Sequence, residues 1–199
     1  MTDIEITGHT RSAFLVRGAL ATGSLYGAGA VGSFVTQAFA QGGGGDVDIL
    51  NFALTLEYLE AAFYKEGIAN AGLSGDAKKL ATEIGDHENE HVAALTQTIK
   101  KLGGKPVQAP GVTFPFKDQK SFLKLAQVFE DTGVSAYNGA APMISSKEVL
   151  GAAGSIVQVE ARHAAAIRFL NGDDPSPAAF DPTLSKQQVL KAVKPFIKG

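Results

Sequence analysis

The sequence predicts an all-α domain: a four-helix bundle followed by a short fifth helix at the C-terminal end. Apolar residues recur at helical spacing over four long segments, and breaks that contain glycine or proline separate these segments. No segment shows the alternation of apolar and polar residues that is typical of strands. In addition, the first two long segments and the last two carry glutamate, tyrosine and histidine in the same order, as expected of side chains that project inward in a bundle.

Residues at the ends of these segments indicate the helix bounds. The five helices are expected over about residues 46–69, 74–102, 117–140, 145–170 and 185–197. Asp46 or Asp48 can cap the first helix, and Gly67 lies near its expected end. Ser145 or Ser146 can cap the fourth helix, and a glycine follows its last residues.

The segment between the second and third helices is long enough to cross the bundle. If these helices are parallel, residues 103–116 must travel roughly 40 Å, and an extended chain of this length reaches about 46 Å. The segment contains three prolines, which favour an extended backbone. The sequence therefore predicts two antiparallel helix pairs joined by one long crossover.

Composition excludes several classes of site and partner. The chain has 199 residues, of which 45% are hydrophobic and 19% charged, as in an ordinary globular domain. The formal net charge of −2, with no run of lysine or arginine, gives no reason to expect a nucleic-acid partner. Because there is no cysteine, disulfides, iron–sulfur clusters and zinc thiolate sites are excluded. Any metal must be held by oxygen and nitrogen atoms.

The first 41 residues predict an export signal or an N-terminal anchor. Residues 18–41 carry no charge, and residues 38–40 match the small-x-small pattern of signal cleavage. The stretch Arg11-Ser12-Ala13-Phe14-Leu15 resembles a twin-arginine export signal, with Ser12 in place of the second arginine. Cleavage would leave a periplasmic or extracellular protein, whereas retention would give a membrane contact. The expected divisions are a signal or anchor (1–41), a glycine linker (42–45), the bundle (46–172) and a C-terminal extension (173–199).

The repeated residues are the strongest functional signal in the chain. In each half a tyrosine follows a glutamate by seven residues, and a Glu-x-x-His motif follows that glutamate by about thirty. The residues are Glu57, Tyr64, Glu88 and His91 in the first half and Glu130, Tyr137, Glu160 and His163 in the second. Residues at i and i+3 share a helix face, so each motif directs both side chains to one side. Four carboxylates and two imidazoles in this order are the inward ligand set of a di-metal bundle.

We expect this set to bind two divalent metal ions. Glu57 and Glu130 would be terminal ligands, and Glu88 and Glu160 would bridge the ions. His91 and His163 would each bind one ion through an imidazole nitrogen. Without metal, the four carboxylates would repel one another in a dry core, and their pKa values would rise. Carboxylate and imidazole ligands suit iron or manganese and also admit zinc, and we expect iron first.

Three further side chains belong to the candidate site. Tyr64 and Tyr137 lie two turns beyond the terminal glutamates, where each can hydrogen-bond a ligand carboxylate or be a core residue with a satisfied hydroxyl. They are the candidate catalytic residues, acting through the ligands. Glu60 follows Glu57 by three residues, so it can be an extra ligand, a base near the site or a polar contact at the helix edge.

A second motif overlaps the first Glu-x-x-His. Residues 87–91 also spell His-Glu-x-x-His, the signature of zinc peptidases, in which His87 and His91 would bind zinc and Glu88 would be the base. The usual third ligand is absent nearby, and this interpretation leaves the second half unexplained. The two interpretations differ in whether Glu88 binds metal. His87 and Glu90 flank the first Glu-x-x-His motif and could surround the site from outside, but we favour a surface position for both. We expect Asp131 to face solvent.

At these residues the chain resembles the ferritin-like superfamily, over about residues 46–172. Residues 54–64, 86–91 and 159–163 look like the first, second and fourth helices of its bacterial desiccation-related branch. The ligand spacing is also similar to that of bacterioferritin, including the tyrosine seven residues after the first glutamate. The resemblance implies that the six repeated glutamates and histidines are di-iron ligands.

The leading functional hypothesis is an exported di-metal oxidoreductase in stress protection. Its partners would be metal ions and a small-molecule oxidant, because such sites typically oxidise Fe(II) or activate O₂ or peroxide. The candidate activities are ferroxidase, peroxidase and catalase. The alternative is a non-catalytic protective bundle whose metal site is structural or vacant. A homo-oligomer is compatible with either.

Overall fold

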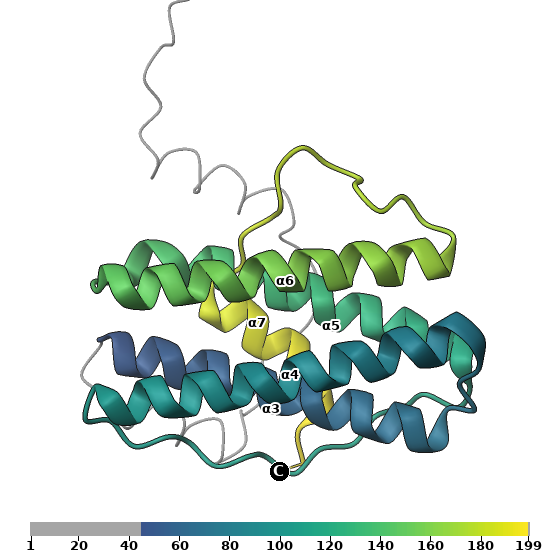
Figure 1. Ribbon diagram of the computed structural model, residues 1–199, viewed down its shortest axis with the longest axis horizontal. Helices are drawn as coiled ribbons and strands as arrows, with labels where there is room; N and C mark the ends of the chain where they lie inside the picture. Colours follow the sequence, from purple (N-terminus) through teal and green to yellow (C-terminus); the bar gives the residue numbers. More distant parts are fainter. Residues whose placement is uncertain (1–44, 199) are drawn as a thin grey trace, which may run out of the picture.

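The computed structural model describes residues 45–198, which form four long helices and a short one (Figure 1). The helices are α3 (Asp46–Asn70), α4 (Gly75–Lys101), α5 (Gln119–Ala140), α6 (Lys147–Asn171) and α7 (Lys186–Val193). Short 3-10 turns follow α5 at Ala141–Met143 and α7 at Lys194–Phe196. One isolated β-bridge, between Val112 and Ile197, is the sole β-pairing of this part of the chain. The predicted all-α class is confirmed.

The bundle consists of two antiparallel hairpins, α3 with α4 and α5 with α6 (Figure 1). Residues 102–118 run along the bundle from the end of α4 to the start of α5, so α4 and α5 point in the same direction. This is the predicted crossover. The C-terminal tail pairs with it, because the Thr113 amide donates to the Phe196 carbonyl and the Lys198 amide to the Gly111 carbonyl, both at 2.9 Å.

The expected export segment, residues 1–41, lies outside the described residues, as do residues 42–44 of the expected glycine linker. Within residues 45–198, no helix combines the length and the apolarity needed to cross a membrane.

The helix starts show two kinds of capping. Ser146 caps α6 as expected, since its hydroxyl accepts the Val149 amide at 3.3 Å. At α3 the expectation was wrong: Gly45 is the cap residue, without a side-chain bond. The Asp46 carboxylate instead accepts the amides of Ser145 and Ser146, at 2.7 and 2.8 Å. Asp46 thus ties the start of the first hairpin to the start of α6, a long-range contact that local capping rules do not anticipate.

Gly67 lies inside α3 rather than at its end. A Cβ atom there would lie 2.0 Å from the ring of Phe122, so the missing side chain lets this ring pack against the helix backbone. The helix continues to Asn70, and the chain turns at Gly72, whose φ of 63° favours glycine.

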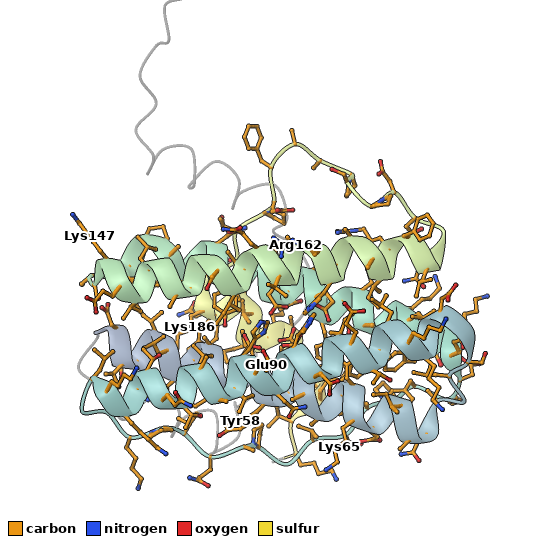
Figure 2. The ribbon with its side chains drawn as sticks, viewed as in Figure 1. Tyr58, Lys65, Glu90, Lys147, Arg162 and Lys186 are labelled. Atoms are coloured by element: carbon orange, nitrogen blue, oxygen red, sulfur yellow. The ribbon has the colours of Figure 1, made fainter. Side chains whose placement is uncertain are left out.

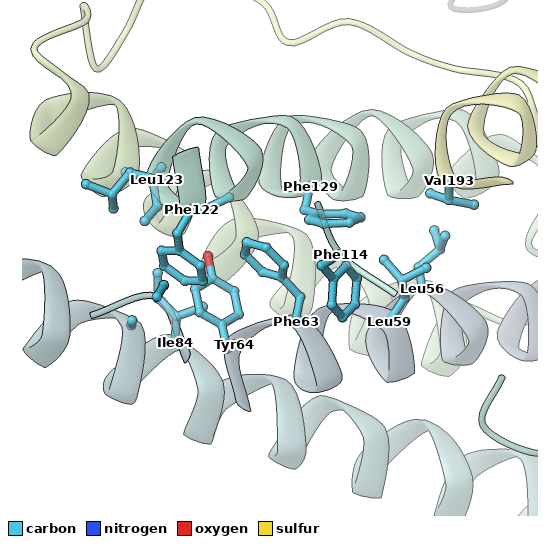
Figure 3. Packing of buried hydrophobic residues seen from close by; sticks show 14 of the residues in the cluster. Leu56, Leu59, Phe63, Tyr64, Ile84, Phe114, Phe122, Leu123, Phe129 and Val193 are labelled. Carbon is cyan, nitrogen blue, oxygen red and sulfur yellow. The ribbon is translucent and has the colours of Figure 1, made fainter. Parts of the chain in front are cut away.

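A core cluster rich in aromatic rings extends from the α3–α4 turn past the middle of the bundle, along the inside of α3 and α5 (Figure 3). The Phe63 ring stacks on Phe122 at 4.6 Å between centroids and also contacts Phe114 and Phe129. Val189 and Val193 of α7 are buried against this cluster. A second cluster at the other end is mainly aliphatic and includes Leu50, Leu54, Leu95, Ile99 and Val149. Close packing on both sides holds the middle of the four long helices at one depth.

Candidate metal centre

The six predicted ligands meet in the middle of the bundle. They form two groups: Glu57, Glu88, His91 and Glu160 in the first, and Glu88, Glu130, Glu160 and His163 in the second. Within each group, one ligand atom from every residue lies within 4.8 Å of the others. Glu88 and Glu160 belong to both groups, as expected of bridging ligands. The helices α3 and α5 contribute one glutamate each, and α4 and α6 contribute a Glu-x-x-His motif each.

Each histidine directs its Nδ1 atom at three carboxylates. His91 Nδ1 lies 3.2 Å from Glu57, 3.3 Å from Glu88 and 2.9 Å from Glu160. His163 Nδ1 lies 3.1 Å from Glu88, 3.3 Å from Glu130 and 3.6 Å from Glu160. The two histidines therefore occupy matching positions, one in each group. All four glutamates of the groups are fully buried, with 0% exposure.

Several of these buried atoms lack a hydrogen bond. They are Glu88 Oε1, Glu130 Oε2, both carboxylate oxygens of Glu160 and His163 Nδ1. Buried polar atoms are rarely left unpaired, because each costs about 1–3 kcal/mol. Hard oxygen and imidazole donors that converge from four helices fit a pair of cations such as iron, manganese or zinc. The residues present thus fit the metals that the spacing predicts.

The carboxylates control the protonation of the two histidines. Burial alone would lower the pKa of His91, but the carboxylates of Glu160, Glu57 and Glu88 raise this pKa to about 12. Burial would likewise lower the pKa of His163, but the carboxylates of Glu130, Glu160 and Glu88 raise this pKa to about 12. In the metal-free protein both imidazoles are therefore cations that partly neutralise the glutamates. A metal ion must displace their protons.

The glutamates divide into two kinds. Burial and then the charge of Glu160 raise the pKa of Glu57 well above its ordinary value. Burial also raises the pKa of Glu130, to about 8, although His163 opposes this shift. For Glu88, burial is outweighed by the interactions with His163 and His91, and the pKa falls to about 2. The lowered pKa of Glu88 favours its ionised form in the metal-free core, whereas the raised pKa values of Glu57 and Glu130 favour their protonated forms.

Each of the two tyrosines hydrogen-bonds a glutamate from the other half of the repeat. Tyr64 on α3 donates a hydrogen bond to Glu130 on α5, and Tyr137 on α5 donates one to Glu57 on α3. Both hydroxyls therefore contact ligand carboxylates, which was one of the two expectations for them. The spacing in the sequence could not indicate that each tyrosine contacts the glutamate of the other half, because this depends on how the hairpins face each other.

Glu60 lies beside the centre without joining either group. It is 3% exposed, and burial and then the charge of Glu160 raise its pKa well above the ordinary value. Asp131, expected to face solvent, is half-buried and forms a 2.8 Å ion pair with Arg168. Glu90 is exposed, as expected.

His87 contacts the centre from outside, a contact that the favoured surface position did not include. Its Nδ1 lies 3.0 Å from His163 Nε2, and the two rings stack. The matching position before the second motif is Val159, so nothing in the repeat signals this contact. Among the described residues, neither ligand group contains His87, whereas both contain Glu88. This geometry disfavours the zinc-peptidase interpretation, which requires Glu88 to be free of the metal.

A surface cavity of about 540 Å³ opens between α4 and α6 and reaches the histidines. Its lining includes His87, His91 and His163, with Glu90 and Arg162 near the surface. Figure 2 shows Glu90 on α4 and Arg162 on α6 near the middle of the bundle. A small molecule or a hydrated ion can therefore approach the centre from this side.

Comparisons with known proteins agree with this architecture. A family model described as a ferritin-like domain matches residues 45–173. Protein rds1 of Schizosaccharomyces pombe is 24% identical over 162 residues, which cover 77% of this chain and 40% of that protein. The chain thus spans less than half the length of this curated relative.

Two solved structures share the fold at low identity. A conserved hypothetical protein, rv2844, from Mycobacterium tuberculosis superposes with a TM-score of 0.59 at 18% identity, over 68% of this chain and 96% of that one. A structure of ferritin like, diiron-carboxylate proteins from Bacillus anthracis gives a TM-score of 0.56 at 20% identity, over 70% and 99%. With the family match over more than half of its length, the chain belongs to the ferritin-like domain family.

Proposed function

We propose that this protein binds two metal ions, iron first, in its Glu/His centre and uses them in the redox handling of Fe(II), O₂ or peroxide. The observation that carries the proposal is the convergence of two ligand groups from four helices, with buried ligand atoms that make no hydrogen bond. When bound, a metal pair of this kind would supply electron transfer to a small oxidant. The Bacillus anthracis proteins of the same fold are described as diiron-carboxylate proteins, which supports the same assignment by analogy.

The residues of this chain would divide the work among them. Glu88 and Glu160 would bridge the ions, and Glu57 with His91 and Glu130 with His163 would complete the two positions. Tyr64 and Tyr137 would hold the terminal glutamates in place through their hydroxyls. The cavity between α4 and α6 would admit the ion or the oxidant.

The biological setting is part of the same proposal. The sequence of residues 1–41 supports export to the periplasm or the extracellular space, by a signal similar to the twin-arginine type. A redox-active metal pair outside the cytoplasm would act in protection against oxidants or desiccation, as the resemblance to the desiccation-related branch suggests.

One observation favours a non-catalytic alternative. The imidazolium forms of His91 and His163 pair with carboxylates at 2.9–3.6 Å, so the core can partly neutralise its own charge without metal. A bundle of this kind could persist as a protective protein whose centre is structural or vacant.

Replacing both bridging glutamates tests the proposal. We expect Glu88→Ala/Glu160→Ala to lose two-metal binding and metal-dependent Fe(II) oxidation, because each residue serves both groups. Asp76→Ala/Glu148→Ala is the matched control, since it removes two exposed carboxylates from the same two helices. Elemental analysis of protein from its own host and oxidation kinetics are the measurements. Two metals retained by the Glu88/Glu160 variant would refute the ligand assignment, and two metals without turnover would favour the structural role.

A further inference from the structure

The repeat between the two halves breaks at one buried position next to the ligands. Three residues after the terminal glutamate, the first half has Glu60 and the second half has Gly133. Glu60 is 3% exposed on α3, facing the centre. A carboxyl group is costly to bury. The presence of Glu60 in the first half alone therefore needs an explanation.

Gly133 provides the space in which the Glu60 carboxylate lies. A Cβ atom at Gly133 would lie 3.1 Å from Glu60 Oε1 and 3.7 Å from Glu160 Oε2. The first distance is shorter than an ordinary contact, so even an alanine would press on the Glu60 carboxylate. The Glu60 and Glu160 oxygens thus both border the space left by the glycine, and Glu160 belongs to both ligand groups.

We propose that Glu60 is a fifth carboxylate ligand of the metal pair, placed beside Glu160 by the space that Gly133 leaves, and that it binds when the two ions carry more than four positive charges. The inference rests on the proposed function, because it requires the two-metal centre.

Charge balance gives the physical reason. Four carboxylates and two neutral imidazoles neutralise two divalent ions. If the pair carries a higher charge, the excess lies in a core where all four glutamates are fully buried, and an unneutralised buried charge is costly. A fifth carboxylate already inside the core can neutralise part of it over a short movement. Glu60 is therefore expected to discriminate between ions by their charge and to matter little for a divalent pair.

Redox-inert ions test this without any turnover. The full chain, freed of metal, is titrated with Zn²⁺ and separately with Ga³⁺, each against a competing chelator. We expect Glu60→Gln to leave the Zn²⁺ affinity within about threefold of wild type and to lower the Ga³⁺ affinity by about tenfold or more. Gly133→Ala should shift the affinities in the same direction, because it displaces the carboxylate without removing it. The double variant should match Glu60→Gln alone, because the glycine acts through Glu60.

Gly154→Ala is the matched control, because it adds a methyl group on α6 where nothing lies within 4 Å. The inference would be overturned if Glu60→Gln and Gly133→Ala both kept the wild-type ratio of Ga³⁺ affinity to Zn²⁺ affinity. This holds whether the two affinities stay unchanged or fall by the same factor. Failure of the proposed function looks different: the wild-type chain itself would then not bind two ions of either kind.

Discussion

The α3–α4 hairpin and the α5–α6 hairpin present the same ligands but are packed differently around them. Phe63, six residues after Glu57, stacks on Phe122, whereas the matching residue six after Glu130 is Ala136. A metal pair would need donors at fixed places, which agrees with the repeat of the candidate ligand positions. Facing surfaces of a close-packed core need large groups against small ones, so the residues between the ligands do not repeat.

The largest expected effect removes one histidine at a time. His91→Ala and His163→Ala should each reduce the metal content from two ions to one, because each histidine belongs to a single group. The affinity for the lost ion should fall by more than the roughly 10–100-fold that an outer partner contributes. His87→Ala, which removes such an outer partner, should retain both ions on titration. Metal analysis after dialysis measures the stoichiometry, and two ions in either ligand variant would contradict the predicted pairing of sites.

The next effect concerns the packing that differs between the halves. Phe63→Ala should lower the free energy of unfolding by about 3–5 kcal/mol, because it opens a cavity among aromatic rings. Phe169→Ala is the control: this ring is 71% exposed, and its removal should cost less than about 0.5 kcal/mol. Urea unfolding of the metal-free proteins measures both, and a similar cost for the two variants would show that the aromatic cluster is not the main packing element.

The stability of the metal-free protein should fall as the pH rises. The pKa values of His91 and His163 rise to about 12 on folding, from an ordinary value of 6.5. The folded state thus keeps protons that the unfolded chain loses above pH 6.5, and the stabilisation present below this pH is lost progressively toward pH 12. The two histidines act in the same direction, so their contributions to this loss add, and Glu130, whose pKa rises to about 8, adds to it in the lower part of the range.

Urea unfolding between pH 6.5 and 9, with a chelator present, measures this loss. His91→Gln should make the fall of stability with pH clearly shallower, because one of the two histidines then no longer contributes. A stability that does not fall with pH over this range would mean that the imidazoles are neutral in the metal-free core.

The smallest expected effect compares the crossed tyrosines. Tyr64→Phe and Tyr137→Phe should each destabilise the protein by about 1–2 kcal/mol, because each leaves a buried glutamate oxygen without its donor. Similar costs are expected, since the two hydrogen bonds are equivalent in the repeat. Tyr58→Phe is the control, because the Tyr58 hydroxyl makes no hydrogen bond within residues 45–198. If Tyr58→Phe destabilised the protein as much as Tyr64→Phe and Tyr137→Phe, the hydrogen bonds from Tyr64 and Tyr137 to the glutamates would have no special role in stability.

Local rules predicted the helices well. Each of the four long helices begins and ends within two residues of its expected bound, because apolar periodicity and glycine breaks act over a few residues. The crossover followed from its length and prolines. Asp46 and Gly67 were misread as local features of one helix, because the amides of Ser145 and Ser146 and the ring of Phe122, which explain them, come from other parts of the chain.

The sequence by itself determined the helical class, the crossover and the candidate ligands, because spacing along a helix places residues on one face. The tertiary structure alone decided which faces meet. It placed each tyrosine on the glutamate of the opposite half and brought His87 to His163. It also set Glu60 in the space beside Gly133. Such contacts depend on the depth and rotation at which two hairpins pack, and these follow from the fit of the whole core rather than from any one segment.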